Sequence, residues 1–230
     1  METTHEPGKK TKIPWRKLFI DKFFDLIMVI LGVYIAFQFN ALKEKSDQRS
    51  LERFYLQSMV TDLKNDIGEI ENNLSNLKND HHLVSGFLQK METSTAKADS
   101  LGPVLINVFS LDTFNPSQNT YSTLVHSNGM SIISRRETLS QMAEYYNQYS
   151  GIRRFEEVYT NVLLKAFEYF SPHCDFATQR ITNPFILARS ETRNFLLIIR
   201  SQLNDGIENY EDALGNARAL EGEIENSLRN

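Results

Sequence analysis

The side chains best placed to do chemistry lie along one apolar stretch of the chain. Asp25 precedes seventeen uncharged residues. At about 100° per residue, a helix places Gly32 and Ala36 roughly 20° to either side of Asp25 and Asn40 about 60° away. Small residues four positions apart let two membrane helices approach closely, and an acid beside them is a functional candidate. The stripe of Asp25, Gly32, Ala36 and Asn40 therefore predicts association with a second span.

Asp25 also has a simpler interpretation. It lies three residues after Lys22, at the end of the apolar stretch, where the cost of a charge falls towards the membrane interface. At that depth the carboxylate reaches the lipid headgroups without contacting another helix. The sequence leaves both interpretations open: Asp25 modulates a contact between spans, or it is an interfacial anchor.

The other residues capable of chemistry do not form a site. His81 and His82 point to different sides of a predicted helix, and the three consecutive residues 173–175 (His-Cys-Asp) cannot all face one metal ion. No phosphate-binding loop, zinc-protease motif or nucleophile elbow occurs. Two acidic pairs fall on predicted helices, where a solvated face is the usual explanation: Glu156-Glu157 and Glu211-Asp212. We therefore expect no enzymatic activity, no metal and no cofactor.

The stretch Phe23–Leu42 is long enough to be a membrane anchor. Its uncharged part makes about 25 Å of helix, close to the roughly 30 Å of a hydrocarbon core. A buried core helix would show a polar face, which is nearly absent before Gln38. A cleaved signal peptide needs small residues at its cleavage site, where this chain has Phe37, Phe39 and Asn40. An uncleaved transmembrane helix is favoured over both alternatives.

Flanking charge predicts the orientation of this helix. Residues 1–22 carry six basic and three acidic side chains, whereas residues 43–230 carry 19 and 25. Because basic residues beside a span stay in the cytoplasm, we expect a short cytoplasmic basic segment (1–22), a transmembrane helix (23–42) and an exported domain (43–230). The net charge of −4 argues against a nucleic-acid partner. Cys174 is the single cysteine, so packing rather than a disulfide must stabilise the exported domain.

Two stretches resemble a known family. Asp25 and the Gly, Ala, Gln and Asn that follow it up to Asn40 resemble the N-terminal span of an uncharacterised family of single-span, mostly helical envelope proteins of Gram-negative bacteria. Residues Thr120–Tyr146 resemble the core of the same family, although Asn128 separates its usual Ser-Gly pair and residue 25 is Asp rather than Glu. The resemblance implies an inner-membrane protein with its C-terminal domain in the periplasm, and it implies no active site.

Hydrophobic periodicity predicts two long helices. Between Leu56 and Met91, apolar residues alternate at spacings of four and three, with His81 as the one polar member. This is a heptad seam of the coiled-coil type. A second seam predicts a helix from Ser190 to Leu228. We expect the two helices to pack antiparallel, with the aliphatic side chains of the first over three small residues of the second: Gly206, Ala213 and Ala217.

Shorter helices are expected between the two long ones. The segment Leu101–Phe114 is predicted as a short helix or an extended cover. Asn119 or Ser117 is expected to cap the next helix, Ser134 to begin another through a capping box, and Ile152–Phe170 to form a separate helix. The fold class is therefore all-α, with a transmembrane helix followed by a helical bundle.

Three functions fit these features. The first is a membrane-anchored scaffold or interaction protein of the cell envelope, with a protein partner or a second copy bound through the span. The second is a helical sensor that binds a small ligand among its aromatic residues and acts through a membrane partner, because about twenty cytoplasmic residues cannot hold a signalling domain. The third is a stator-like subunit of a proton-driven membrane complex, since Phe23–Leu31 resembles the start of the single span in biopolymer-transport stators.

Overall fold

The computed structural model describes residues 15–127 and 129–229, with side chains from residue 22 onward. The chain is 86% helical and 2% strand, which confirms the all-α fold class. It divides into two compact units, Met1–Leu51 and Glu52–Asn230, so the second unit begins later than the expected start of the exported domain at residue 43. Most of the predicted basic segment 1–22, and Asn128 of the family-like stretch, lie outside the described residues.

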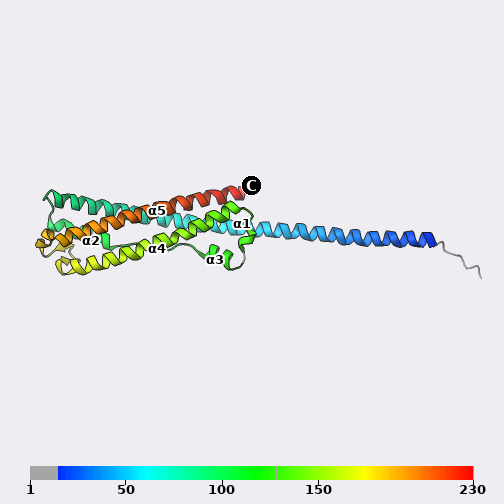
Figure 1. Ribbon diagram of the computed structural model, residues 1–230, viewed down its shortest axis with the longest axis horizontal. Helices are drawn as coiled ribbons and strands as arrows, with labels where there is room; N and C mark the ends of the chain where they lie inside the picture. Colours follow the sequence, from blue (N-terminus) through cyan, green and yellow to red (C-terminus); the bar gives the residue numbers. More distant parts are fainter. Residues whose placement is uncertain (1–14, 128, 230) are drawn as a thin grey trace, which may run out of the picture. The chain divides into compact units, whose positions relative to one another are not determined.

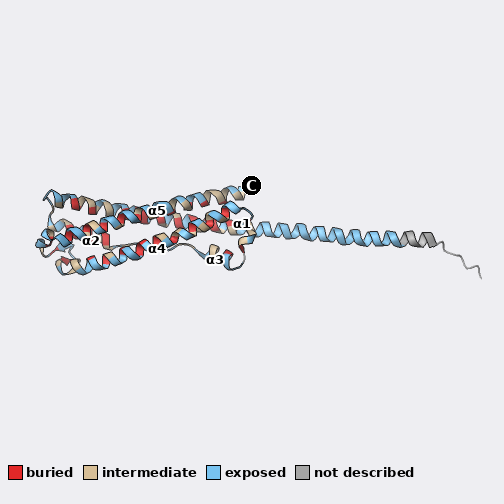
Figure 2. Cartoon of the chain, viewed as in Figure 1, coloured by how far each residue is buried: buried red, intermediate tan, exposed pale blue. Residues whose placement is uncertain are grey.

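The first unit contains the beginning of helix α1 (Trp15–Glu92), which also supplies the first part of the second unit. The chain forms a helix here because it has no proline between Trp15 and Glu92 and a long run of good helix formers. From residue 22 to residue 51 every side chain is exposed (Figure 2). The large apolar side chains of Phe23–Leu42 are among them, and no described residue of their own unit covers them.

Three long helices run the length of the second unit: α1 from Glu52, α4 (Arg136–Phe170) and α5 (Ser190–Arg229) (Figure 1). Lys64 lies 3.3 Å from Glu225, and Lys78 lies 2.6 Å from Glu211. The partners on α5 come in the reverse order to those on α1, so these two helices are antiparallel, as expected. Such exposed pairs contribute little to stability, but they fix which residues face each other.

The heptad seam of α1 faces the core of the second unit. Eight of its members are buried and three, Ile67, His81 and Met91, are half-buried. His81 is therefore a partly exposed seam histidine rather than part of a ligand set. The buried members are Leu56, Val60, Leu63, Ile70, Leu74, Leu77, Val84 and Leu88.

Helix α4 is continuous, so the expected division into two helices is wrong. Gly151 lies inside it, and the buried face runs across that point through Tyr149, Ile152 and Phe155. Burial of these large side chains on one face outweighs the roughly 1 kcal/mol that a glycine costs inside a helix. The glycine lets a side chain of α5 approach closely, because an added Cβ would lie only 3.2 Å from Asn209 Oδ1.

The predicted N-caps are also wrong. Asn119 is the first residue of α3 (Asn119–His126) rather than its cap, and α4 begins after Arg135 without a side-chain cap. Ser134 instead donates from its backbone nitrogen and its hydroxyl to Glu52 Oε1, at 2.6 and 2.8 Å. A tertiary contact with a carboxylate on α1 replaces the local capping interaction.

Small elements close the two ends of the second unit. Helix α2 (Leu101–Phe109) and α3 lie at opposite ends (Figure 1), and the extended residues 110–118, called here the strap, connect them. The segment 101–114 is thus partly helix and partly extended cover, and both expected forms occur. A hairpin of two short strands precedes α5, and four 3-10 turns complete the described part of the chain: β1 (Cys174–Asp175), β2 (Arg180–Ile181), η1 (Ala98–Ser100), η2 (Gly129–Ile132), η3 (Ser171–His173) and η4 (Pro184–Ala188).

The small residues of α5 do not all serve the predicted contact with α1. A Cβ built on Gly206 would overlap the ring of Phe155, which belongs to α4. The pairs Arg135–Glu223 and Tyr169–Thr192, at 3.0 and 2.9 Å, show that α4 and α5 are antiparallel. Gly206 thus admits an aromatic ring of α4 rather than an aliphatic side chain of α1.

Gly206→Ala should destabilise the folded chain by about 1–3 kcal/mol, because the new methyl group overpacks the contact with Phe155. Gly215→Ala is the matched control: it changes an exposed glycine of the same helix, has open space around its Cβ, and should stabilise by up to about 1 kcal/mol. Thermal unfolding followed by circular dichroism measures both. Equal melting temperatures for the two variants would contradict the assigned packing of α4 on α5.

Candidate functional site

The predicted stripe lies on an open helix face. Asp25, Gly32, Ala36 and Asn40 are all exposed, and a Cβ added to Gly32 would meet no atom within 4 Å. Asp25 Oδ2 lies 3.5 Å from Lys22 Nζ, and both side chains are more than two-thirds exposed. The ion pair fits the interfacial-anchor interpretation of Asp25. The described residues of the first unit place nothing against the stripe, so span association stays a prediction.

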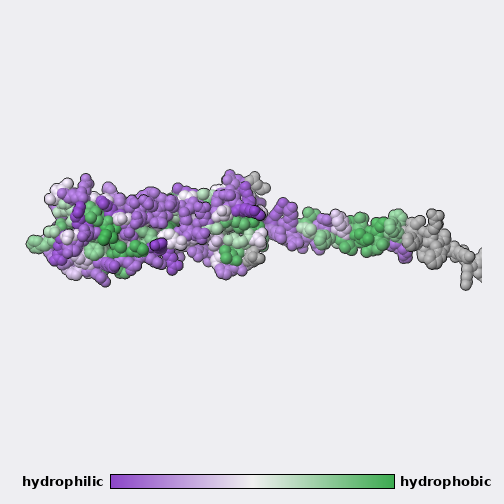
Figure 3. Space-filling model, in the orientation of Figure 1, coloured by the Kyte–Doolittle hydropathy of each residue, from purple (hydrophilic) through white to green (hydrophobic). Residues whose placement is uncertain are grey.

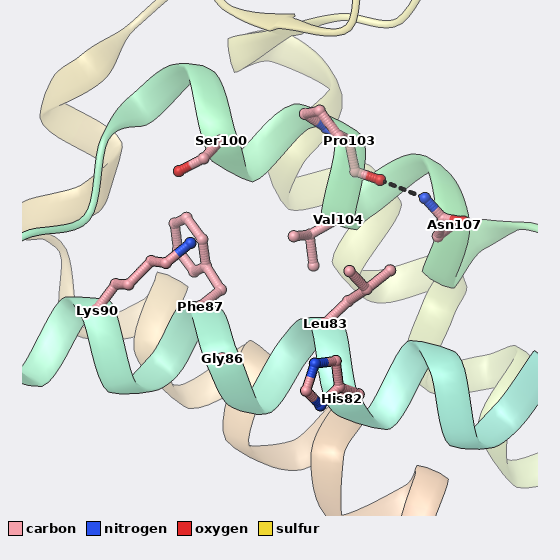
Figure 4. Close-up of a pocket in the computed structure, with 9 residues that line it drawn as sticks. All are labelled: His82, Leu83, Gly86, Phe87, Lys90, Ser100, Pro103, Val104 and Asn107. Carbon is pink, nitrogen blue, oxygen red and sulfur yellow. Dashed lines mark hydrogen bonds between the residues drawn. The ribbon is translucent and has the colours of Figure 1, made fainter.

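The two adjacent histidines separate as expected. His82 lines a cavity of about 310 Å³ between α1 and α2, together with Lys90. Figure 4 shows Lys90 and Phe87 reaching from α1 towards α2. Asn107, on the opposite wall, donates from Nδ2 to the carbonyl oxygen of Pro103 at 2.9 Å. Lys90 is exposed and the amide is already bonded, so this cavity has few polar atoms left to hold a ligand.

The His173–Asp175 segment has a structural role. Cys174 is buried and pairs with Ile181 in the hairpin. Asp175 accepts hydrogen bonds from the hydroxyl of Thr178 at 2.7 Å and from the backbone nitrogen of Ala177 at 3.0 Å. The Thr178 bonds lower the pKa of Asp175. Within the described residues, no three His, Cys, Asp or Glu side chains form a group that could hold a metal ion.

Glu156 does not lie on a solvated helix face, which corrects the expectation for the Glu156-Glu157 pair. Glu156 is 9% exposed. Its Oε1 accepts from the backbone nitrogen of Phe114 and from the hydroxyl of Tyr210, both at 2.7 Å. Glu157 is exposed, as predicted, and pairs with Arg153 at 3.3 Å. Helical spacing places Glu156 on the inner side of α4, and a buried charge is tolerated there because donors from the strap and α5 meet it.

A second buried acid, Asp66, joins α1 to the strap and to α4. Its Oδ1 accepts from the backbone nitrogen of Ser117 at 2.8 Å, and its Oδ2 accepts from the hydroxyls of Tyr145 and Tyr149 at 2.9 and 2.8 Å. Burial raises the pKa of both tyrosines far above the ordinary value. The two hydroxyls therefore stay protonated and act as donors. Both oxygens of Asp66 are in use.

Glu156 also lines a cleft of about 440 Å³. One wall is the strap, which contributes Phe114 and Pro116, and the other is α4, which contributes Tyr149 and Ile152. Both hydrogen bonds printed for Glu156 end on Oε1. Within the described residues Oε2 is not one of the buried oxygens that lack a partner, so it is open to the solvent of the cleft. Chemically, the cleft offers a carboxylate oxygen beside a mixed surface, with the polar side chains of Asn115 and Gln118 as well as the apolar surface of Ile152.

Hydrophobic periodicity does not identify these buried acids, because they are polar. Buried positions recur every seven residues on α1 beside the apolar seam, at Met59, Asp66, Asn73 and Phe87, with half-buried Asp80 in the same register. A seven-residue period that includes polar residues was the available signal. This period is recognised only if polar side chains are counted as possible core residues.

No protein-family model, curated protein or solved structure matches the chain. The resemblance of residues 25–40 and 120–146 to a family of envelope proteins therefore stays a prediction. Any function has to be argued from the geometry of the two units themselves.

Asp80→Asn should stabilise the chain at about pH 8 and not at about pH 4. Burial raises the pKa of Asp80 from 3.8 to about 6. The folded state therefore binds the proton more tightly than the unfolded state, and the associated stability is lost as the pH rises through about 6. Because Asp80 is only partly buried, we expect a gain of only about 1 kcal/mol at the higher pH. Melting curves at both pH values, with exposed Asp205→Asn as the control, measure it. A gain at both pH values would contradict the assignment.

Proposed function

We propose that this protein is a membrane-anchored helical scaffold that binds other components of the cell envelope. In this proposal, residues 23–42 cross the inner membrane once, residues 1–22 are cytoplasmic, and residues 43–230 form an exported helical bundle. The observation that carries the proposal is the apolar part of α1. An 18-residue window there has a mean hydropathy of 1.8, and none of it is buried.

The exposure of this window supports a membrane span over a core helix. Each large apolar side chain left in water forgoes about 1.5–3 kcal/mol of burial free energy, and Phe23, Phe24, Phe37 and Phe39 are all more than half exposed. Figure 3 shows this part of α1 as a nearly unbroken apolar surface. The hydrocarbon core of a membrane would cover these side chains. It offers no hydrogen-bond partners to the backbone, but a helix needs none because its backbone groups bond to one another.

Flanking charge supports the proposed orientation. Six basic residues precede the window, whereas acidic residues exceed basic ones after it. Five of the six basic residues, Lys9, Lys10, Lys12, Arg16 and Lys17, lie outside the residues whose side chains are described. The proposed orientation therefore rests on the sequence rule alone.

The second unit offers surface for protein contacts. An apolar groove of about 370 Å³ lies between the start of the strap and α4, lined among others by Phe109, Leu164 and Phe167. Leu164 and Phe167 are 57% and 45% exposed. Exposed apolar side chains that gather in one groove are typical of binding surfaces. This groove favours a scaffold over a purely structural anchor.

Orientation can be tested with a membrane-impermeant maleimide in a Gram-negative expression host. Burial protects Cys174 and raises the pKa of its thiol, so the test uses Cys174→Ser with a new cysteine at exposed Ser150. We expect full labelling in intact spheroplasts. Cys174→Ser alone, which has no cysteine, is the blank. The mass of the intact protein shows whether the N-terminus has been cleaved. Labelling that requires permeabilised membranes would overturn the proposed topology.

Gly32→Leu should weaken association between spans, whether the partner is a second copy or another envelope protein. The substitution fills the face on which Gly32 and Ala36 allow close approach. Val33→Leu is the matched control, because it adds bulk to the neighbouring face of the same helix. A membrane two-hybrid assay should report a several-fold lower signal for Gly32→Leu than for Val33→Leu. Equal signals would remove the stripe from the proposal and leave Asp25 as an interfacial anchor.

A further inference from the structure

The cleft beside Glu156 contains a buried carboxylate, which the cavity beside His82 and the groove beside Phe167 do not. Its floor and walls come from the strap and from one face of α4, on which Tyr149, Ile152, Arg153 and Glu156 follow each other at helical spacing. Glu156 is nine-tenths buried. Arg153, in contrast, is at the solvent side of the cleft, where its side chain is 82% exposed and paired with Glu157.

The structural role of Glu156 uses only half of its carboxylate. The nitrogen of Phe114 and the hydroxyl of Tyr210 both donate to Oε1. Asp66 makes the comparison clear, because its three donors occupy both of its oxygens. A single carbonyl oxygen could also accept both of these hydrogen bonds, although each would be weaker than a bond to a carboxylate. The second oxygen of Glu156 therefore remains for a donor that comes from outside the chain.

We propose that this cleft binds a small organic ammonium ion, whose N–H groups donate to Glu156 Oε2. A charge-assisted hydrogen bond is among the stronger polar contacts available to a protein. The body of the ligand lies against Pro116, Ile152 and the ring of Tyr149, which packs against Phe114 at a centroid distance of 5.5 Å. Aromatic faces next to the carboxylate favour a cation further.

The position of Arg153 limits the class of ammonium compound. A guanidinium at the rim repels a second positive charge, so polyamines are disfavoured. It attracts a carboxylate instead, and an α-amino acid presents an ammonium and a carboxylate a few ångströms apart. Both candidate ligands, a simple amine and an α-amino acid, have an ammonium group. They differ in whether Arg153 also contributes to binding.

The test is isothermal titration of the full chain in a non-ionic detergent. The probes are 2-phenylethylamine, L-phenylalanine and the neutral analogue 2-phenylethanol. We expect binding of at least one ammonium probe and at least tenfold weaker binding of the alcohol. Arg153→Gln should weaken L-phenylalanine and leave the amine unchanged if the amino acid is the better ligand.

Glu156→Gln is the decisive variant. Its amide oxygen can keep the bonds to Phe114 and Tyr210 while an NH₂ group replaces Oε2, so the fold is retained and the ammonium should bind at least tenfold more weakly. Glu157→Gln removes the same charge one residue away, outside the cleft, and should bind normally. Gln118→Trp, a bulky change at an exposed lining residue, provides a second loss of binding that does not depend on Glu156.

The outcomes separate cleanly. Binding that is lost in Glu156→Gln and Gln118→Trp but kept in Glu157→Gln supports the proposal. Absence of binding for every ammonium probe, or equal binding of the amine by Glu156→Gln and Glu157→Gln, would overturn it. Neither result depends on the membrane topology or on a protein partner, so the scaffold proposal stands or falls separately.

Discussion

The second unit depends on two buried carboxylates that accept hydrogen bonds from an extended segment. The strap crosses the unit without forming a helix or pairing in a sheet, so its backbone donors have no regular partners. Asp66 accepts from Ser117, and Glu156 accepts from Phe114. A buried backbone N–H without a partner costs about 1–3 kcal/mol. The acids on α1 and α4 therefore make it possible for an extended chain to lie in a helical core.

The same acids set the register between the long helices. Tyr145 and Tyr149 of α4 reach Asp66 of α1, and Tyr210 of α5 reaches Glu156. An apolar seam alone tolerates a shift by one heptad, because the replacement side chains are also apolar. A shift that separates a buried carboxylate from its donors is much more costly. Polar contacts therefore select one arrangement from several that hydrophobic burial would allow.

The two proposals use different parts of the chain for different physical reasons. The first unit exposes apolar side chains that need a non-aqueous cover, which is the basis for the membrane anchor. The second unit buries most of its large apolar side chains and has one partly used carboxylate in a cleft, which is the basis for the ammonium site. Because the strap forms one wall of that cleft, an occupant would contact the segment that Asp66 and Glu156 hold in place.

The sequence by itself determined the features that depend on local repetition. The apolar run at 23–42, the seam of α1 and the start of α5 at Ser190 follow from periodicity and composition, which neighbouring residues carry. Tertiary structure decided the rest. Helix α4 continues through Gly151, and Ser134 bonds to Glu52 instead of capping a helix. Phe155 packs against Gly206, and Glu156 faces the interior. Each of these depends on a partner distant in sequence, and local propensities of about 1 kcal/mol are too small to resist burial and hydrogen bonds formed across the fold.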